Sequence, residues 1–130
     1  MLPLCRAEGI GVIPWSPMAR GKLTRPWETT PTTARGESDE FGKTLFVHTQ
    51  EADRLVVERL GQVAEARGIP RAQLSLAWLL HQPGVTAPII GATRPDHLDD
   101  AVAALALKLS PEDLALLEEP YVPHARVGFS

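Results

Sequence analysis

Twice in this chain, a short apolar run ends abruptly in small and turn-forming residues. At residues 11–23, Ile-Pro-Trp-Ser-Pro leads into Met-Ala-Arg-Gly-Lys-Leu, and at residues 85–95, Ile-Ile-Gly-Ala-Thr-Arg-Pro follows a second apolar segment. Continuous apolar runs of this length are typical of buried parallel strands. A loop or helix start directly after such a strand leaves backbone N–H groups free to hold an anion. The two junctions therefore predict phosphate-binding chemistry at two places in the chain.

The order of the elements predicts a fold class. A helical stretch separates the two junctions, as in the last two strand–helix units of a parallel (β/α)8 barrel, whose seventh and eighth loops commonly bind phosphate. A closed barrel typically needs about 250 residues, and this chain has 130. We therefore expect an α/β fold that is a partial (β/α)8 TIM barrel: its last two strand–helix units plus a C-terminal helix, forming one domain over residues 1–130.

Hydrophobic periodicity sets the expected elements. Strands are predicted over residues 10–15 and 86–90, with Pro14 tolerated near a strand end. A helix stub at residues 2–8 should stop at Gly9, and a helix from Asp53 to Arg67 should stop at Gly68. The expected apolar stripe of this helix consists of Val56, Leu60, Val63 and Ala64. Another helix is expected across residues 98–105, with an apolar stripe of Leu98, Ala101, Val102 and Leu105. A further helix should begin at Pro70 and end before residues 82–84.

Two capping signals refine the helix starts. Ser110-Pro-Glu-Asp113 combines an N-cap serine, a proline at the first helical position and acids near the positive helix end, and Pro120 should end that helix. Thr93 and Asp96 have the spacing of a second capping box. The polar tract from Arg25 to Thr44 is too long for a routine connection and is predicted to be either a flap over the site or solvated disorder.

Composition excludes several classes of function. The formal net charge of −3 gives no electrostatic reason for a nucleic-acid partner. A single cysteine forms no internal disulfide, no apolar stretch approaches the ~20 residues of a membrane span, and no targeting segment is visible. We therefore expect a cytoplasmic protein with no membrane partner. The four histidines do not have metal-ligand spacing, so no metal is predicted.

Three motifs in order resemble the aldo-keto reductase family. Residues 9–23 resemble its seventh strand and Ser-Pro-Leu-Ala-x-Gly-x-Leu cofactor loop, and residues 70–80 resemble its Ala-Gln-x-Ala-Leu-Ala-Trp-Leu helix. Residues 89–100 resemble its eighth-strand junction. Together they cover nearly the whole chain, which is similar to the C-terminal portion of such an enzyme, of the bacterial and channel-subunit-like branch.

The resemblance implies an NADP(H) site. Arg94 is the implied clamp for the 2′-phosphate, because a guanidinium stays charged and donates two parallel hydrogen bonds. His97 would reach the same phosphate or the adenine, while Ala101 departs from the asparagine that the family commonly places there. The implied cofactor-binding residues are Ser16, Pro17, Met18, Gly21, Leu23, Ile90, Gly91, Ala92, Thr93, Arg94, His97 and Asp100.

Each of these residues also has a simpler explanation. An arginine at a helix start is commonly a solvated charge, and Ser16 is equally suited to capping a turn. Ser16 is a poor hydrolase nucleophile because Trp-Ser-Pro lacks the Gly-x-Ser-x-Gly elbow. Trp15 is as consistent with packing as with a substrate pocket, and Trp78 is assigned to the core.

Catalysis is not expected from this chain alone. Aldo-keto reductases use a tyrosine, lysine, aspartate and histidine from the first half of the barrel, and the one tyrosine here, Tyr121, follows the last predicted helix. No catalytic residue is assigned. The resemblance implies the cofactor-binding part of an NADP(H)-dependent oxidoreductase that reduces a small-molecule aldehyde or ketone when complete. A non-catalytic nucleotide-sensing module and a truncated, non-functional fragment are the alternatives.

Incomplete burial is the expected structural consequence. Two parallel strands alone leave open edges and uncovered helix faces. We expect the chain by itself to be unstable, to self-associate or to need its missing N-terminal half-barrel. We also expect Ser16 and Arg94 to line one common cleft.

Overall fold

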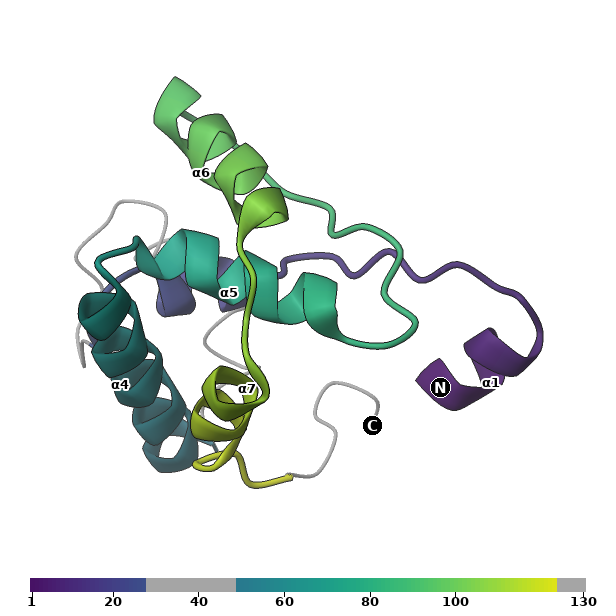
Figure 1. Cartoon of the computed structure of the whole chain (residues 1–130), viewed down its shortest axis with the longest axis horizontal. Helices are drawn as coiled ribbons and strands as arrows, with labels where there is room; N and C mark the ends of the chain where they lie inside the picture. Colours follow the sequence, from purple (N-terminus) through teal and green to yellow (C-terminus); the bar gives the residue numbers. More distant parts are fainter. Residues whose placement is uncertain (28–48, 124–130) are drawn as a thin grey trace.

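The computed structural model describes residues 1–27 and 49–123, and this part of the chain is mostly helical (Figure 1). Most of the polar tract after Arg25 and the end of the tail lie outside the described residues, as do His48 and His124. In order, the elements are α1 (Leu2–Ala7), a 3₁₀ segment η1 (Ala19–Thr24), α4 (Gln50–Arg67), α5 (Arg71–His81), α6 (Pro95–Ala106) and α7 (Pro111–Glu118). The predicted helices are therefore all present.

Three helices, α4, α5 and α7, form a helical block around one apolar core. Leu74 and Ala77 of α5 are fully buried, and they meet the buried side of α4 and the segment leading to α7. The predicted stripe of α4 is correct at Leu60, Val63 and Ala64, but Val57 is buried in place of Val56, which is half-buried. The core consists of Leu60, Val63, Ala64, Leu74, Ala77, Leu109 and Leu117, with Trp78 packed against it.

Polar contacts fix α7 to the rest of the block. Arg67 of α4 donates from Nη1 to Asp113 at 2.9 Å and from Nη2 to the carbonyl of Lys108 at 2.9 Å. On the other side, Trp78 Nε1 donates to Glu118 at 3.0 Å. Because these bonds join residues about 40 positions apart, they hold the C-terminal helix in one orientation on the block.

One predicted cap forms and the other does not. Ser110 and Asp113 make the reciprocal bonds of a capping box at the start of α7, and Gly68 ends α4 in the left-handed conformation with φ 63°. At α6 the prediction is wrong, because Arg94 rather than Thr93 is the N-cap and no side chain caps the helix. Asp96 is instead engaged by the Arg94 guanidinium.

The two predicted strands lie side by side and parallel, but they are not regular strands. They pair through isolated bridges, Val12 with Val85 and Trp15 with Ile89. The amides of Thr86 and Ile89 donate to the carbonyls of Val12 and Pro14, each at 2.8 Å. The prolines at positions 14 and 88 have no N–H group to donate. They therefore limit the number of backbone hydrogen bonds that the two extended segments can form with each other.

Apolar side chains on this side of the molecule are exposed rather than buried. Trp15 is 66% exposed and Ile13 and Ile89 are exposed beside it, although the sequence pattern predicted buried strands. The predicted stripe of α6 has the same outcome: Leu98, Val102 and Leu105 are exposed, and the residue of α6 that is buried is Ala104. No described element covers these faces. Among the described residues, no helix combines the length and the apolar character that a membrane crossing needs.

Candidate functional site

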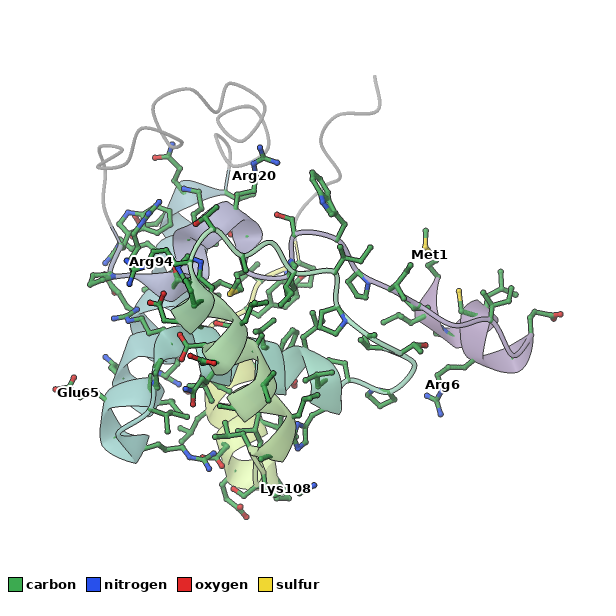
Figure 2. All side chains as sticks on the ribbon, turned by 90° about the horizontal axis from the view of Figure 1, so that it is seen from above. Met1, Arg6, Arg20, Glu65, Arg94 and Lys108 are labelled. Carbon is green, nitrogen blue, oxygen red and sulfur yellow. The ribbon has the colours of Figure 1, made fainter. Side chains whose placement is uncertain are left out.

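Both predicted junctions line the same cleft, which has a volume of about 750 Å³. The first junction contributes the end of its extended segment and η1, the second contributes the start of α6, and the N-terminal turns of α5 complete the wall. Ser16 and Arg94 both line it, as expected from the sequence. In Figure 2, Arg20 and Arg94 lie at the same end of the molecule, while Met1 and Arg6 lie on the opposite side.

Most of the residues predicted to bind a cofactor meet in this cleft. Ala92 does not line it, and Leu23 packs against the helical core instead. The alternative packing role considered for Trp15 does not remove it from the site, because its ring also lines the cleft. The predicted residues that the cleft brings together are Ser16, Pro17, Met18, Gly21, Ile90, Gly91, Thr93, Arg94, His97 and Asp100.

The first loop has an unusual backbone. Ser16, Ala19 and Arg20 adopt positive φ angles of 56°, 48° and 57°, a region that residues other than glycine seldom occupy. Such strain commonly marks functional sites. Short turns support the loop, with the amide of Ala19 donating to Ser16 O at 3.0 Å and that of Gly21 to Met18 O at 3.0 Å.

Several backbone amides beside the cleft donate to no other described residue, and two of them come from facing loops. One belongs to Met18 in the first junction and the other to Gly91 in the second. Both residues line the cleft. Unpaired amides on facing loops are suited to bind phosphate oxygens or another anion.

The charges of the cleft also favour an anion. Four arginines line it, Arg20, Arg25, Arg71 and Arg94, against two aspartates, Asp96 and Asp100. Of the arginines, the sequence motifs indicated Arg94 alone. Arg20 lies over the Trp15 ring at 5.7 Å from its centroid, a cation–π contact. Arg25 and Arg71 were missed because nothing in the sequence shows that the start of α5 and the end of η1 meet, whereas Arg20 lies within the first junction and could have been predicted from it.

Arg94 is held by a neighbour within its own helix turn. Its Nε donates to Asp96 Oδ1 at 3.0 Å and its Nη2 to Oδ2 at 2.5 Å, so both nitrogens face one carboxylate. The Arg94 hydrogen bonds hold the pKa of Asp96 below its ordinary value. Both side chains are largely exposed, and exposed pairs of this kind contribute little to stability. The Arg94 guanidinium is therefore already oriented, and it can exchange the Asp96 carboxylate for an anion that binds it more strongly.

Hydrogen bonds also hold the other polar side chains near the start of α6. Asp100 accepts a hydrogen bond from Gln73 Nε2 at 2.8 Å, which connects α6 to α5. The amide of Thr93 donates to His97 Nδ1 at 3.4 Å, so His97 turns back toward the helix start. This bond gives His97 a local structural role beside the role that the resemblance implied.

The side chains that the family resemblance links to proton transfer are not gathered in the cleft. Among the described residues that line it there is no tyrosine and no lysine. Tyr121 lies after α7 and is 59% exposed. The described residues also contain no group of three or more histidine, cysteine or acidic side chains able to hold a metal ion.

The sequence pattern of the Aldo/keto reductase family matches residues 1–121. The chain is 41% identical over 127 residues to a versiconal hemiacetal acetate reductase of Aspergillus parasiticus, covering 96% of this chain and 36% of the relative. It is 35% identical over 130 residues to an aldo-keto reductase of Alternaria alternata, covering 100% of this chain and 34% of the relative. These relatives are fungal and do not support the bacterial or channel-subunit-like branch.

Two solved structures are similar in fold. A thermostable aldo-keto reductase crystallised with the inhibitor epalrestat is 26% identical, with a TM-score of 0.59 over 92% of this chain and 33% of that one. The glycerol dehydrogenase of Gluconobacter oxydans, at 22% identity, has a TM-score of 0.65 over 100% of this chain and 41% of its own. The chain thus spans about a third of the length of the curated relatives it matches.

Proposed function

Because this chain belongs to the aldo/keto reductase family, we propose that it forms the cofactor-binding part of an NADP(H)-dependent oxidoreductase that reduces aldehydes or ketones. The observation that carries the proposal is the common cleft, in which residues of two junctions far apart in the sequence meet, including Ser16 and Arg94.

The residues of the cleft fit a phosphorylated dinucleotide. Amides of Met18 and Gly91 suit the pyrophosphate, and the excess of arginine over aspartate suits a ligand with several negative charges. Apolar side chains of Met18 and Ile90 offer surface to the uncharged parts of the ligand. A volume of about 750 Å³ is in the range of small-molecule sites in proteins.

Arg94 is proposed to select the phosphorylated form of the coenzyme. Its planar fork already makes two parallel bonds to Asp96, which is the geometry that a ribose 2′-phosphate would accept. A dianionic phosphate competes well with one carboxylate for the guanidinium. NAD(H) lacks this group and would leave the Arg94–Asp96 pair unchanged.

In this proposal the chain binds and orients rather than transferring protons. When bound, the nicotinamide cofactor supplies the hydride, and the residues of this chain hold the cofactor and limit its access to water. The acid that protonates the carbonyl oxygen is assigned to no residue here, because Tyr121 lies outside the cleft. We therefore expect the 130-residue chain alone to be inactive, with the carbonyl substrate bound only by a complete barrel or assembly.

Ligand binding to the purified chain tests this function. Isothermal titration with NADPH and with NADH, on protein shown to be helical by circular dichroism, should give tighter binding of NADPH. One extra bidentate charged contact favours NADPH by about tenfold or more. A folded chain that binds neither nucleotide would contradict the proposal and favour the non-functional fragment. Equal binding of both would contradict the assignment of NADP(H).

A further inference from the structure

Two residues that are unfavourable at their positions in a helix meet beside the cleft, which Arg71 lines. Gly61 lies inside α4, where glycine is less favourable than alanine. Arg71 is the first residue of α5, where a positive charge faces the positive end of the helix dipole. Helix stability explains neither residue, but the contact between them accounts for both.

The Arg71 guanidinium lies directly on Gly61. A Cβ atom built on Gly61 would come within 2.0 Å of Arg71 Nη2 and 2.4 Å of Cζ, so any side chain there would displace the arginine. In this position Nη1 donates to the carbonyl of Val57 in α4 at 2.9 Å and reaches the carbonyl of Arg25 at 3.4 Å. The arginine thus joins α4, α5 and the residue that follows η1.

The loop that Arg71 reaches packs on α5 and α4 and contains backbone positions with unfavourable φ angles. Residues 16–21 include the strained positions, and the bond from Thr24 Oγ1 to Gly21 O at 2.9 Å is internal to the loop. Leu23 packs on the core, and Arg71 holds the carbonyl at the loop's end. A backbone with unfavourable φ angles needs such contacts to keep one conformation.

We propose that Arg71 is a positioning residue for the cleft: seated on Gly61, it holds Arg25 and the end of η1 against α4 and so fixes the loop that contributes Ser16 to Gly21. Arg71 and Arg25 both line the cleft, so a displaced arginine alters its wall directly. The effect on nucleotide binding rests on the function proposed above, whereas the effect on the loop does not.

Gly61→Ala and Arg71→Met test the contact from its two sides. Alanine raises helix propensity, so by that measure Gly61→Ala should stabilise α4. Through the contact, it should instead displace Arg71 and act like Arg71→Met. Because both variants remove the same interaction, the double variant should be no worse than either single one. Arg67→Met is the matched control, since Arg67 also joins α4 to a backbone carbonyl but does not line the cleft.

Hydrogen exchange in the nucleotide-free chain gives the first measurement. Amides of residues 19–27 should exchange faster in Gly61→Ala and Arg71→Met, with no further gain in the double variant and no change in Arg67→Met. Wild-type exchange rates at these amides in Gly61→Ala, or effects that add in the double variant, would overturn the proposal. This result does not depend on whether the chain binds NADP(H).

The affinity for NADP⁺ gives the second measurement. Both single variants should bind about tenfold more weakly, the loss expected for a charged hydrogen bond, and Arg67→Met should bind as the wild type does. Arg71→Lys keeps the charge without the fork, so it should remain weak. Full affinity in Arg71→Lys would show that charge alone matters and would overturn positioning. A wild-type chain that does not bind NADP⁺ would refute the proposed function, and the exchange data would still decide the role of Arg71.

Discussion

The helical block and the cleft side of this molecule are built in opposite ways. In the block of α4, α5 and α7, apolar residues are buried and long-range hydrogen bonds fix the helices. On the cleft side, apolar residues of the extended segments and α6 are exposed, and the backbone pairing amounts to two bridges. We therefore expect most of the stability to come from the block, while many of the binding groups lie on loops and on α6, whose apolar side chains are largely exposed although the helix packs on α5.

The largest expected effect compares one substitution on the two sides. Leu74→Ala empties a fully buried position of the block and should lower the free energy of unfolding by about 2–5 kcal/mol. Leu98→Ala, at a position of α6 that is 52% exposed, is the matched control and should cost far less. Urea titrations followed by circular dichroism measure both. Equal losses would show that α6 is as important to stability as the block.

The α7 cap should give the next largest effect. Ser110→Ala removes the acceptor for the Asp113 amide and should destabilise the chain by about 1 kcal/mol. Ser110→Thr retains the hydroxyl and should recover most of the loss. Chemical denaturation is the measurement. If Ser110→Ala were as stable as the wild type, the capping box would not contribute to holding α7 on the block.

Sequence reasoning succeeded where local rules decide the structure. Gly68, the Ser110 cap and the period of Leu60 and Leu74 determine helix ends and faces through contacts within a few residues. It failed at Thr93, because the nearby Arg94 guanidinium takes the carboxylate that the cap would have needed. Burial of the extended segment at residues 10–15 was also predicted wrongly, because burial depends on what covers a segment and Ile13 and Trp15 are exposed.

The site shows the same division. The motifs predicted that Ser16 and Arg94 would share a cleft, and they do. Nothing local in the sequence places Arg71 on Gly61 or against Arg25, because those residues come from three separate segments. The binding of NADP(H) itself stays a proposal.

Asp96→Asn tests how the charges of the cleft side affect the affinity for NADP⁺. Removing the carboxylate frees Arg94 and removes a charge that repels phosphate, so NADP⁺ should bind about two- to fivefold more tightly while NAD⁺ is unaffected. Because Arg94 lowers the pKa of Asp96, the carboxylate stays charged above its ordinary pKa and is protonated only as the pH falls through the lower value. The gain should therefore persist while the 2′-phosphate is dianionic, above about pH 6, and protonation of Asp96 does not limit it there. Weaker NADP⁺ binding would instead indicate that Asp96 is needed to orient Arg94.

Polar substitutions on the exposed face of α6 should have the smallest effect on stability. Val102→Ser and Leu105→Ser change residues that are each 67% exposed and should alter the free energy of unfolding by no more than about 0.5 kcal/mol. The same substitutions should reduce self-association in sedimentation experiments, because they remove exposed apolar surface. A large loss of stability without any change in association would contradict the contrast between the two sides.

The most direct test of the central claim is the ratio of NADP⁺ to NAD⁺ affinity in Arg94→Gln, measured by titration calorimetry. Arg54→Gln is its matched control, since Arg54 is also an arginine paired with acids on a helix but does not line the cleft. The account predicts that Arg94→Gln loses the preference for NADP⁺, by about tenfold or more, while Arg54→Gln keeps it. An unchanged ratio in Arg94→Gln would contradict the assignment of this cleft to a phosphorylated coenzyme.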